Sequence, residues 1–242
     1  GSAETWHPQF TYYGFRYVEV EGAVPVGESN PGALPEVIDI TGLHTRNSAA
    51  QVGTFACSDP LFNKIHTLID WAVRSNMASV LTDCPHREKL GWLEVTHLMG
   101  GSIQYRYDIS RLYAKQVNDM RTAQHANGMV PTIAPQYVTF SPDFIDTPEW
   151  GSAFVIIPWN LYEWYGDLAP LRDNYERMKR YVDYLGSRAD NHIVAYGLGD
   201  WYDIGPDRPG YAQLTSNGVT ATAIYYQDVK ILERVARLLG KE

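Results

Sequence analysis

Hydrophobic and polar positions alternate along the first part of the chain, and a helical period replaces this pattern further on. Residues 10–21 alternate Tyr, Phe and Val with polar residues, as strands do. Similar short runs occupy 35–46 and 52–57, and the Pro- and Gly-rich stretch 24–35 predicts a loop. Because three strands form a weak unit on their own, we expect residues 1–57 to be the last antiparallel strands of a β-sandwich and a linker.

The helical period begins at residue 58. Residues 58–60 read Ser-Asp-Pro, which combines a capping hydroxyl, an acid and a proline at a helix start. Apolar residues then recur on one helical face from Leu61 to Val73, and Pro85 predicts that this helix ends at or just before Cys84. Five more helices are expected, at 91–107, 109–125, 148–165, 169–188 and 219–239.

Two long segments without periodicity separate these helices. Residues 129–148 hold four prolines, and residues 196–217 are rich in Gly, Pro, Asp and Trp. Long loops of this kind in compact domains are usually functional. Helices that alternate with long loops are typical of an (α/α)6 toroid. We therefore expect a mainly α fold of this kind over residues 58–242, with about six long helices; the resemblance described below implies that these residues are the N-terminal part of an incomplete catalytic barrel. Pro158 should kink the helix that contains it or mark its start.

Charge and overall composition narrow the class of protein. The chain has 242 residues, with 20 Lys or Arg and 28 Asp or Glu, so the formal net charge is −8. This balance argues against nucleic acid and anionic membrane as partners, because both need a basic surface. An apolar fraction of 45% excludes a disordered chain, and no apolar run reaches the ~20 residues of a transmembrane helix.

Aromatic residues are abundant, with 17 Tyr, 7 Trp and 7 Phe. Two interpretations stay open: a large aromatic core, or a carbohydrate site in which sugar rings lie on aromatic faces and acidic groups bind hydroxyls. The two cysteines form neither a disulfide framework nor a zinc motif. We expect Cys84 to be a buried structural thiol, because His86 is too close along the chain to act as its base. No phosphate or dinucleotide motif is present, so neither a metal nor a cofactor is expected.

The densest group of chemically active residues lies in 82–94, TDCPHREKLGWLE. On one continuous helix Glu88 and Glu94 would lie about 240° apart, at ~100° per residue, and could not share a face. Pro85 and Gly91 instead predict a turn between two helices.

Such a turn can point Asp83, Glu88 and Glu94 into one pocket. Crowded carboxylates raise one another's pKa, and Arg87 offsets that effect. One protonated and one ionised carboxyl is the pair that glycoside hydrolysis requires. The alternative is a structural turn with solvated charges and an Arg–Glu pair.

Two further segments carry candidate ligand contacts. Residues 148–151, PEWG, put Trp150 at a helix start, where it could stack on a sugar ring or anchor the core. Residues 197–205, GLGDWYDIG, put Asp200 and Trp201 on a glycine-rich loop. Exposed aromatic side chains on such a loop suit ligand contact better than stability.

The run DCPHREKLGW at 83–92 resembles the signature of bacterial α-L-rhamnosidases of glycoside hydrolase family 78. The resemblance extends over nearly the whole chain and implies a β-sandwich followed by an (α/α)6 barrel that carries an inverting active site. The supporting segments are YYGFRYVEVEG at 12–22, TFACSDPLFNKI at 54–65, PEWGSA at 148–153 and GLGDWYD at 197–203.

The resemblance also implies roles for single residues. Glu88, the Glu of the PxRE run, corresponds to the general acid. Many members read GWxGD where this chain reads GWLEV, so the Asp of that motif is absent and Glu94 is expected to substitute for it. The substrate-binding positions implied in this way are Asp83, Arg87, Trp92, Glu94, Trp150, Asp200 and Trp201.

The family's general base lies far downstream, on the last helices of the barrel, and no residue here corresponds to it. We therefore expect this chain to be about half a barrel, with its base outside residues 1–242. An open half-barrel exposes apolar helices and favours aggregation or a homodimer. The implied substrates are L-rhamnosides of plant polysaccharides or glycosides, and a periplasmic or extracellular location is favoured over a cytoplasmic one.

Two other functions remain as alternatives. The first is a different inverting glycosidase on the same fold, for instance one that acts on uronides. Such a site needs basic residues for the substrate carboxylate, and the pocket segments offer chiefly Arg87, with Arg208 as a second candidate. The second is a non-catalytic carbohydrate-binding module, which would keep the tryptophans without needing a paired base.

Overall fold

Helices dominate residues 2–241, the part of the chain that the computed structural model describes. Six of them have 11 or more residues, which confirms the mainly helical class. In chain order the helices are α1 (Pro60–Asn76), α2 (Leu93–Ile103), α3 (Ser110–Ala123), α4 (Pro142–Ile145), α5 (Pro148–Gly151), α6 (Ala153–Tyr165), α7 (Ala169–Ser187) and α8 (Asn217–Leu238).

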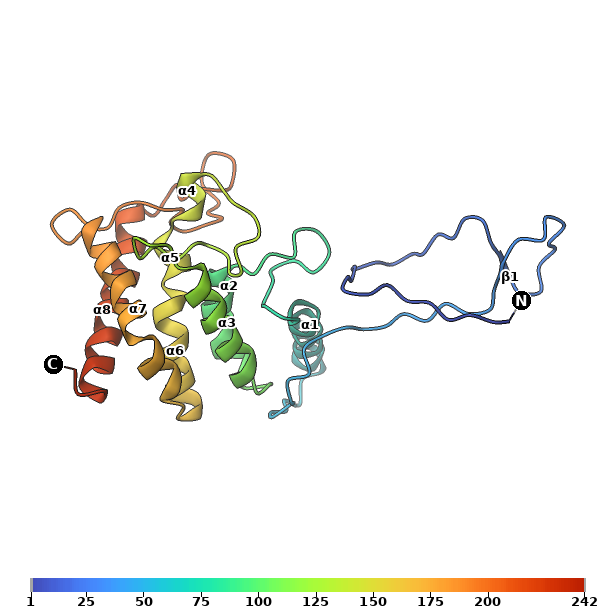
Figure 1. Ribbon diagram of the computed structural model, residues 1–242, viewed down its shortest axis with the longest axis horizontal. Helices are drawn as coiled ribbons and strands as arrows, with labels where there is room; N and C mark the ends of the chain where they lie inside the picture. The colour runs from blue at the N-terminus through green and yellow to red at the C-terminus, as the bar shows by residue number, and fades with distance from the viewer. Residues whose placement is uncertain (1, 242) are drawn as a thin grey trace.

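Helix α6 forms the centre of the helical body, with α3, α7 and α8 packed around it (Figure 1). Its sequence is apolar on all sides, which is the pattern of a helix buried on all sides, and every residue from Ala153 to Pro158 is buried. Pro158 lies inside α6 and not at its start, so the second of the two expected outcomes is wrong, and the expected kink stays a prediction. Buried Asp228 of α8 and Ser152 before α6 share a hydrogen bond of 2.6 Å, which ties these two helices together.

Both ends of α1 differ from the prediction. Asp59, not Ser58, caps its start, because the Asp59 carboxylate accepts a hydrogen bond of 2.8 Å from the Leu61 amide. The helix ends at Asn76 and not near Cys84, because the Thr82 amide donates to the Asn76 carbonyl at 3.0 Å and folds the chain back. The chain therefore enters the motif at residues 82–94 as a loop.

The strand predictions for the first 57 residues are largely wrong. The only strands in the described part of the chain are β1 (Val24–Pro25) and β2 (Glu36–Val37), which pair in parallel rather than antiparallel. A strand needs a neighbouring backbone for its N–H and C=O groups, and residues 10–21 find none within the described chain. Residues 2–46, here called the N-terminal arm, run away from the helical body (Figure 1).

Helix α1 lies beside the body with its apolar face uncovered, and none of its residues is buried. Leu61 is 60% exposed and Leu68 is 62% exposed. The periodic stripe that predicted the helix is correct, but within residues 2–241 only its last residue, Val73, packs against the core, and most of its face is exposed. Among those residues, no helix combines the length and apolar character that crossing a membrane requires.

Candidate active site

The loop between α1 and α2 gathers a carboxylate, a thiol and a second carboxylate. A ligand atom from each of Asp83, Cys84 and Glu88 lies within 4.8 Å of the others. The Cys84 thiol donates to Glu88 Oε1 at 3.2 Å, and the Trp92 indole Nε1 donates to Glu88 Oε2 at 3.1 Å. Both oxygens of the Glu88 carboxyl group therefore have a fixed donor.

The two carboxyl groups of this loop have pKa values shifted in opposite directions. Burial would raise the pKa of Glu88, but hydrogen bonds from Cys84, Asp83 and Trp92 and the charge of Arg87 lower it below its usual value. Burial and the neighbouring Glu88 raise the pKa of Asp83, against an opposing contribution from Cys84. The pair can therefore hold one proton between its two carboxyl groups, and Asp83 holds it more tightly.

Lys89 anchors this loop to the N-terminal arm. Its Nζ donates to the Tyr12 carbonyl oxygen at 2.5 Å and lies 4.0 Å from the centre of the Tyr13 ring. The Tyr137 hydroxyl donates to the Lys89 carbonyl at 2.8 Å from the opposite side. Lys89 itself has a φ of +56°, in the left-handed region that turns the chain sharply. The arm thus supports the backbone next to Glu88.

A second acidic cluster surrounds Glu94 in the first turn of α2. Burial, together with the charges of Glu149 and Asp200, raises the pKa of Glu94 to about 7. Glu149 is buried and accepts hydrogen bonds of 2.8 Å from the hydroxyls of Thr147 and Thr220. The charges that act on Glu94 come from α5 and the loop that follows α7, and a single pocket shared by Asp83, Glu88 and Glu94 stays a prediction.

Glu149 was missed by the sequence analysis, although it stands beside Trp150 in the PEWG segment. Trp150 itself is only 3% exposed and belongs to the core. Its burial favours the core interpretation, and its expected stacking on a sugar ring stays a prediction. Both residues are buried on the four-residue helix α5, and the charge of Glu149 acts on Glu94 from there.

An aromatic row links the loop before α2 with the loop after α7. Trp92 stacks on Phe140 with ring centres 5.3 Å apart, and Phe144 of α4 lies 5.8 Å from Trp92. Phe144 in turn meets Trp201 edge to face at 5.4 Å, and Trp201 meets Tyr211 at 5.5 Å. Two of the three tryptophans predicted to contact ligand, Trp92 and Trp201, therefore stand in one row. They are joined by Phe144, which no sequence motif singled out.

The loop that carries Asp200 and Trp201 is held over α5. The Leu198 amide donates to the Thr147 hydroxyl at 3.1 Å, and the Asn217 amide group donates to the Gly197 carbonyl at 2.7 Å. A side chain at Gly197 would lie 2.6 Å from that hydroxyl, and its φ of +106° also favours glycine. The loop can approach this closely only because the residue has no Cβ.

The Asp83, Cys84 and Glu88 cluster is also the one group within residues 2–241 whose spacing could hold a metal ion. A thiolate and two carboxylates would suit Zn²⁺ with an open position. Hydrogen bonds from Cys84 and Trp92 already engage both Glu88 oxygens. The expectation of a metal-free site therefore stays a prediction.

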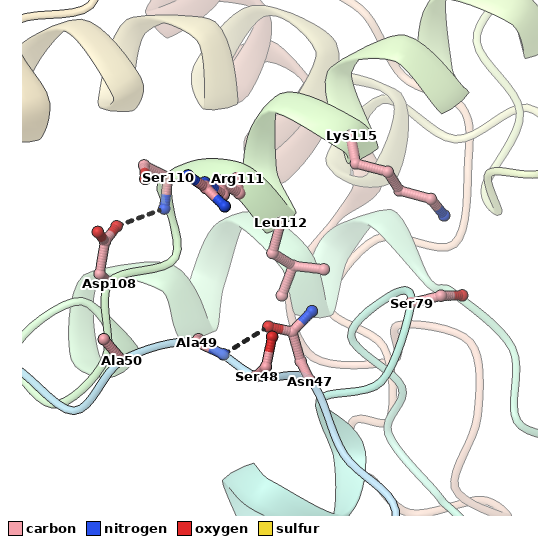
Figure 2. Close-up of a pocket in the computed structure, with 10 residues that line it drawn as sticks. All are labelled: Asn47, Ser48, Ala49, Ala50, Ser79, Asp108, Ser110, Arg111, Leu112 and Lys115. Carbon is pink, nitrogen blue, oxygen red and sulfur yellow. Dashed lines mark hydrogen bonds between the residues drawn. The ribbon is translucent and has the colours of Figure 1, made fainter.

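Two cavities flank the body. One, of about 550 Å³, lies at the start of α3 and is lined by Asn47, Ser79, Arg111 and Lys115 among others, none of them a candidate site residue (Figure 2). The other, of about 330 Å³, lies between α4 and the loops near Tyr196 and Tyr211. The second cavity is next to the end of the aromatic row.

Comparisons with known proteins cover the whole chain. The model of the bacterial alpha-L-rhamnosidase 6 hairpin glycosidase domain matches residues 50–242, and that of the bacterial alpha-L-rhamnosidase concanavalin-like domain matches residues 1–44. An alpha-L-rhamnosidase of Formosa agariphila is 34% identical over 97% of this chain and 25% of its own length. One from Streptomyces avermitilis is 33% identical over 99% of this chain and 22% of its own length.

Solved structures agree with these relatives. The alpha-L-rhamnosidase from Dictyoglumus thermophilum has a TM-score of 0.74 at 38% identity, over 81% of this chain and 22% of that one. The Streptomyces avermitilis alpha-L-rhamnosidase complexed with L-rhamnose has a TM-score of 0.72 at 31% identity, over 81% of this chain and 18% of that one. The chain spans about a quarter of the length of the curated relatives it matches.

Proposed function

This chain belongs to the bacterial α-L-rhamnosidase family, and from that premise we propose that it supplies the acid side of an inverting α-L-rhamnosidase active site. The proposed enzyme removes terminal α-L-rhamnose from plant polysaccharides or glycosides. The observation that carries the proposal is the Glu88 carboxyl group, held by Cys84 and Trp92 and next to Asp83. It is an oriented acid within a group of carboxylates and aromatic rings.

In this mechanism Glu88 passes the proton that it shares with Asp83 to the glycosidic oxygen as the bond to the sugar breaks. Water attacks the other face of the sugar and gives its proton to a second carboxylate. Inverting enzymes separate the two carboxyl groups by ~6.5–9.5 Å to leave room for that water. Asp83 lies within 4.8 Å of Glu88, which is too close for this role. Asp83 is therefore proposed to bind sugar hydroxyls and to share a proton with Glu88.

The proposed sugar-binding groups come from three segments of the chain. Trp92 and Trp201 offer apolar ring faces for the sugar and for the 6-methyl group of rhamnose. Arg87, which is exposed beside Glu88, is proposed to bind hydroxyls together with Asp83. Glu94 and Asp200 act on each other through their charges, and we propose them as further hydroxyl acceptors.

We also propose a boundary between residues 57 and 58. Residues 1–57 would belong to a β-sandwich and its linker, and residues 58–242 to the catalytic barrel. The contrast between the N-terminal arm and the helical body supports this division (Figure 1).

The test is Glu88→Gln in the complete protein, including any sequence that flanks this chain. Turnover of methyl α-L-rhamnoside, which has a poor leaving group, should fall about 10²–10⁴-fold, the usual contribution of a general acid. Turnover of p-nitrophenyl α-L-rhamnoside should fall much less, because nitrophenolate leaves without a proton. Binding of L-rhamnose, measured by calorimetry, should persist.

The matched control is Glu163→Gln, since Glu163 is an exposed glutamate of α6. It should leave the turnover of both substrates unchanged. Unchanged turnover of the methyl rhamnoside by Glu88→Gln would overturn the proposed role of Glu88. If the unaltered protein binds L-rhamnose but hydrolyses neither substrate, a carbohydrate-binding module replaces the enzyme as the best description.

A further inference from the structure

The Cys84 side chain makes two hydrogen bonds to Glu88. Its thiol donates to the Glu88 carboxyl at 3.2 Å, and its sulfur accepts from the Glu88 backbone amide at 3.5 Å. The sulfur therefore contacts Glu88 at the main chain and at the end of the side chain. A thiol that only filled space in the core would not need either contact.

The second donor to Glu88 comes from the other direction along the chain. Trp92 lies four residues after Glu88, Cys84 lies four residues before it, and each binds a different carboxylate oxygen. Cys84 is only 8% exposed, whereas Glu88 is exposed. An exposed glutamate has many rotamers open to it, and the buried Cys84 on one side and the partly buried Trp92 on the other limit their number.

We propose that Cys84 is a positioning residue, whose thiol holds the Glu88 carboxyl group in the orientation from which it protonates the glycosidic oxygen. This inference rests on the proposed function of Glu88. It replaces the purely structural role that the sequence suggested for Cys84. The thiol does not react in this role: it forms no covalent bond, and its proton stays on sulfur.

The same contact affects the proton affinity of Glu88. A donor to the carboxylate favours the ionised form, so the thiol lowers the pKa of Glu88, as do the bonds from Asp83 and Trp92. The other charged or titratable groups near this pair are Arg87 and Tyr137 beside Glu88, and Tyr12 beside Cys84. Replacing the thiol by a methyl group removes one contribution and leaves the others in place.

The experiment compares Cys84→Ala with Cys84→Ser in the complete protein, including any sequence that flanks this chain. In Cys84→Ala we expect kcat on methyl α-L-rhamnoside to fall about tenfold with little change in KM, because a misplaced acid slows the chemical step. On p-nitrophenyl α-L-rhamnoside the fall should be smaller. The serine hydroxyl is also a donor, so Cys84→Ser should recover most of the lost rate.

The pH profile separates positioning from packing. Activity that depends on a general acid declines above the apparent pKa of that acid. Loss of one weak donor raises the pKa of Glu88, so in Cys84→Ala the alkaline limb should move upward by roughly half a pH unit. Cys84→Ser should keep the original limb. A packing defect would lower the turnover of both substrates equally and would not move the alkaline limb of the pH profile.

Cys57→Ala is the matched control, because Cys57 is the exposed cysteine and lies before α1. It should change neither rate nor pH profile. Suppose that Glu88→Gln is inactive on methyl α-L-rhamnoside, while Cys84→Ala keeps the parental rates and an unmoved alkaline limb. The proposal for Cys84 would then be overturned, and that for Glu88 would stand. If Glu88→Gln is active, the proposed function fails first. If Cys84→Ala does not fold, Cys84→Ser still tests the proposal. A tenfold loss of kcat and a moved alkaline limb in Cys84→Ser would contradict it.

Discussion

At the scale of single residues, the two acidic clusters differ in how their carboxyl groups are treated. Glu88 has two donors and an arginine, which favour its ionised form. Burial and the charges of Glu149 and Asp200 instead raise the pKa of Glu94 to about 7. Glu94 therefore changes charge near neutral pH, whereas an ordinary glutamate does so near pH 4.5.

The first prediction follows from the sign of that shift. A carboxyl group whose pKa is higher in the folded state holds its proton more tightly there, so folding is favoured below pH 4.5 and this contribution declines as pH rises towards 7. Glu94→Gln cannot ionise. Its melting temperature should therefore gain on the parent by several degrees between pH 5 and pH 8, as measured by calorimetry.

Glu163→Gln corrects for the loss of one negative charge at an exposed position. A gain for Glu94→Gln that is the same at both pH values, or no larger than that of the control, would contradict the raised pKa of Glu94.

The motif residues were predictable from sequence because their chemistry is local, but their partners were not. Residues 82–94 are consecutive in the chain, so the sequence alone shows that acidic residues are concentrated there. Glu149 is 55 positions from Glu94, and its charge reaches Glu94 only through the packing of α5. Trp150 next to it carried the stronger signal and proved to be a core residue.

At the scale of helices, glycine pairs in α2 determine how closely α3 approaches. An added Cβ at Gly100 would lie 2.0 Å from the Tyr113 hydroxyl oxygen, whereas one at Gly101 would meet nothing within 4 Å. The Tyr113 hydroxyl donates to the carbonyl of Thr96, one turn earlier on α2. Gly100 thus lets a tyrosine of α3 bind the backbone of α2.

The second prediction compares these neighbours. Gly101→Ala should stabilise the protein by about 0.5–1 kcal/mol, because alanine favours a helix over glycine. Gly100→Ala has the same helical advantage but must displace Tyr113, so it should destabilise by about 1–3 kcal/mol. Denaturant unfolding measures both. If the two variants shift stability in the same direction, the close approach of α2 and α3 is not what requires Gly100.

Helix existence was predictable from periodicity, whereas helix ends were not. Each of the six long helices overlaps a predicted one, although the helix predicted at 148–165 is divided into α5 and α6. The end of α1 was wrong by several residues, because Thr82 folds back on Asn76 and that contact has no periodic signal. The strands failed for a different reason: alternation selects residues that suit a sheet, but pairing depends on a partner backbone that residues 10–21 lack within the described chain.

At the scale of the whole molecule, α1 exposes an unusually large apolar face. Six apolar side chains of one helix are each at least 40% exposed. Large contiguous apolar patches on a protein surface usually mark contacts with another surface. These side chains are Leu61, Phe62, Ile65, Leu68, Ile69 and Trp71.

The third prediction is that residues 1–242, expressed alone, self-associate through this face. Sedimentation velocity should give a weight-average mass that rises with protein concentration. Leu61→Glu combined with Leu68→Glu should keep the protein monomeric over the same range. Val26→Glu, at a 55% exposed position of the N-terminal arm, is the control and should still associate. A parent that stays monomeric at high concentration would contradict the prediction.

The contact of Lys89 with Tyr12 also bears on the order in which the molecule folds. It joins residues 77 positions apart, whereas the contacts of Cys84 and Trp92 with Glu88 span four. Closing a long loop is entropically harder than closing a short one, and contacts between distant residues slow folding. The hydrogen bonds from Cys84 and Trp92 to Glu88 can therefore form early during folding, whereas the bond from Lys89 to Tyr12 forms late. Competence for proton transfer would then lag behind the appearance of helical structure during refolding.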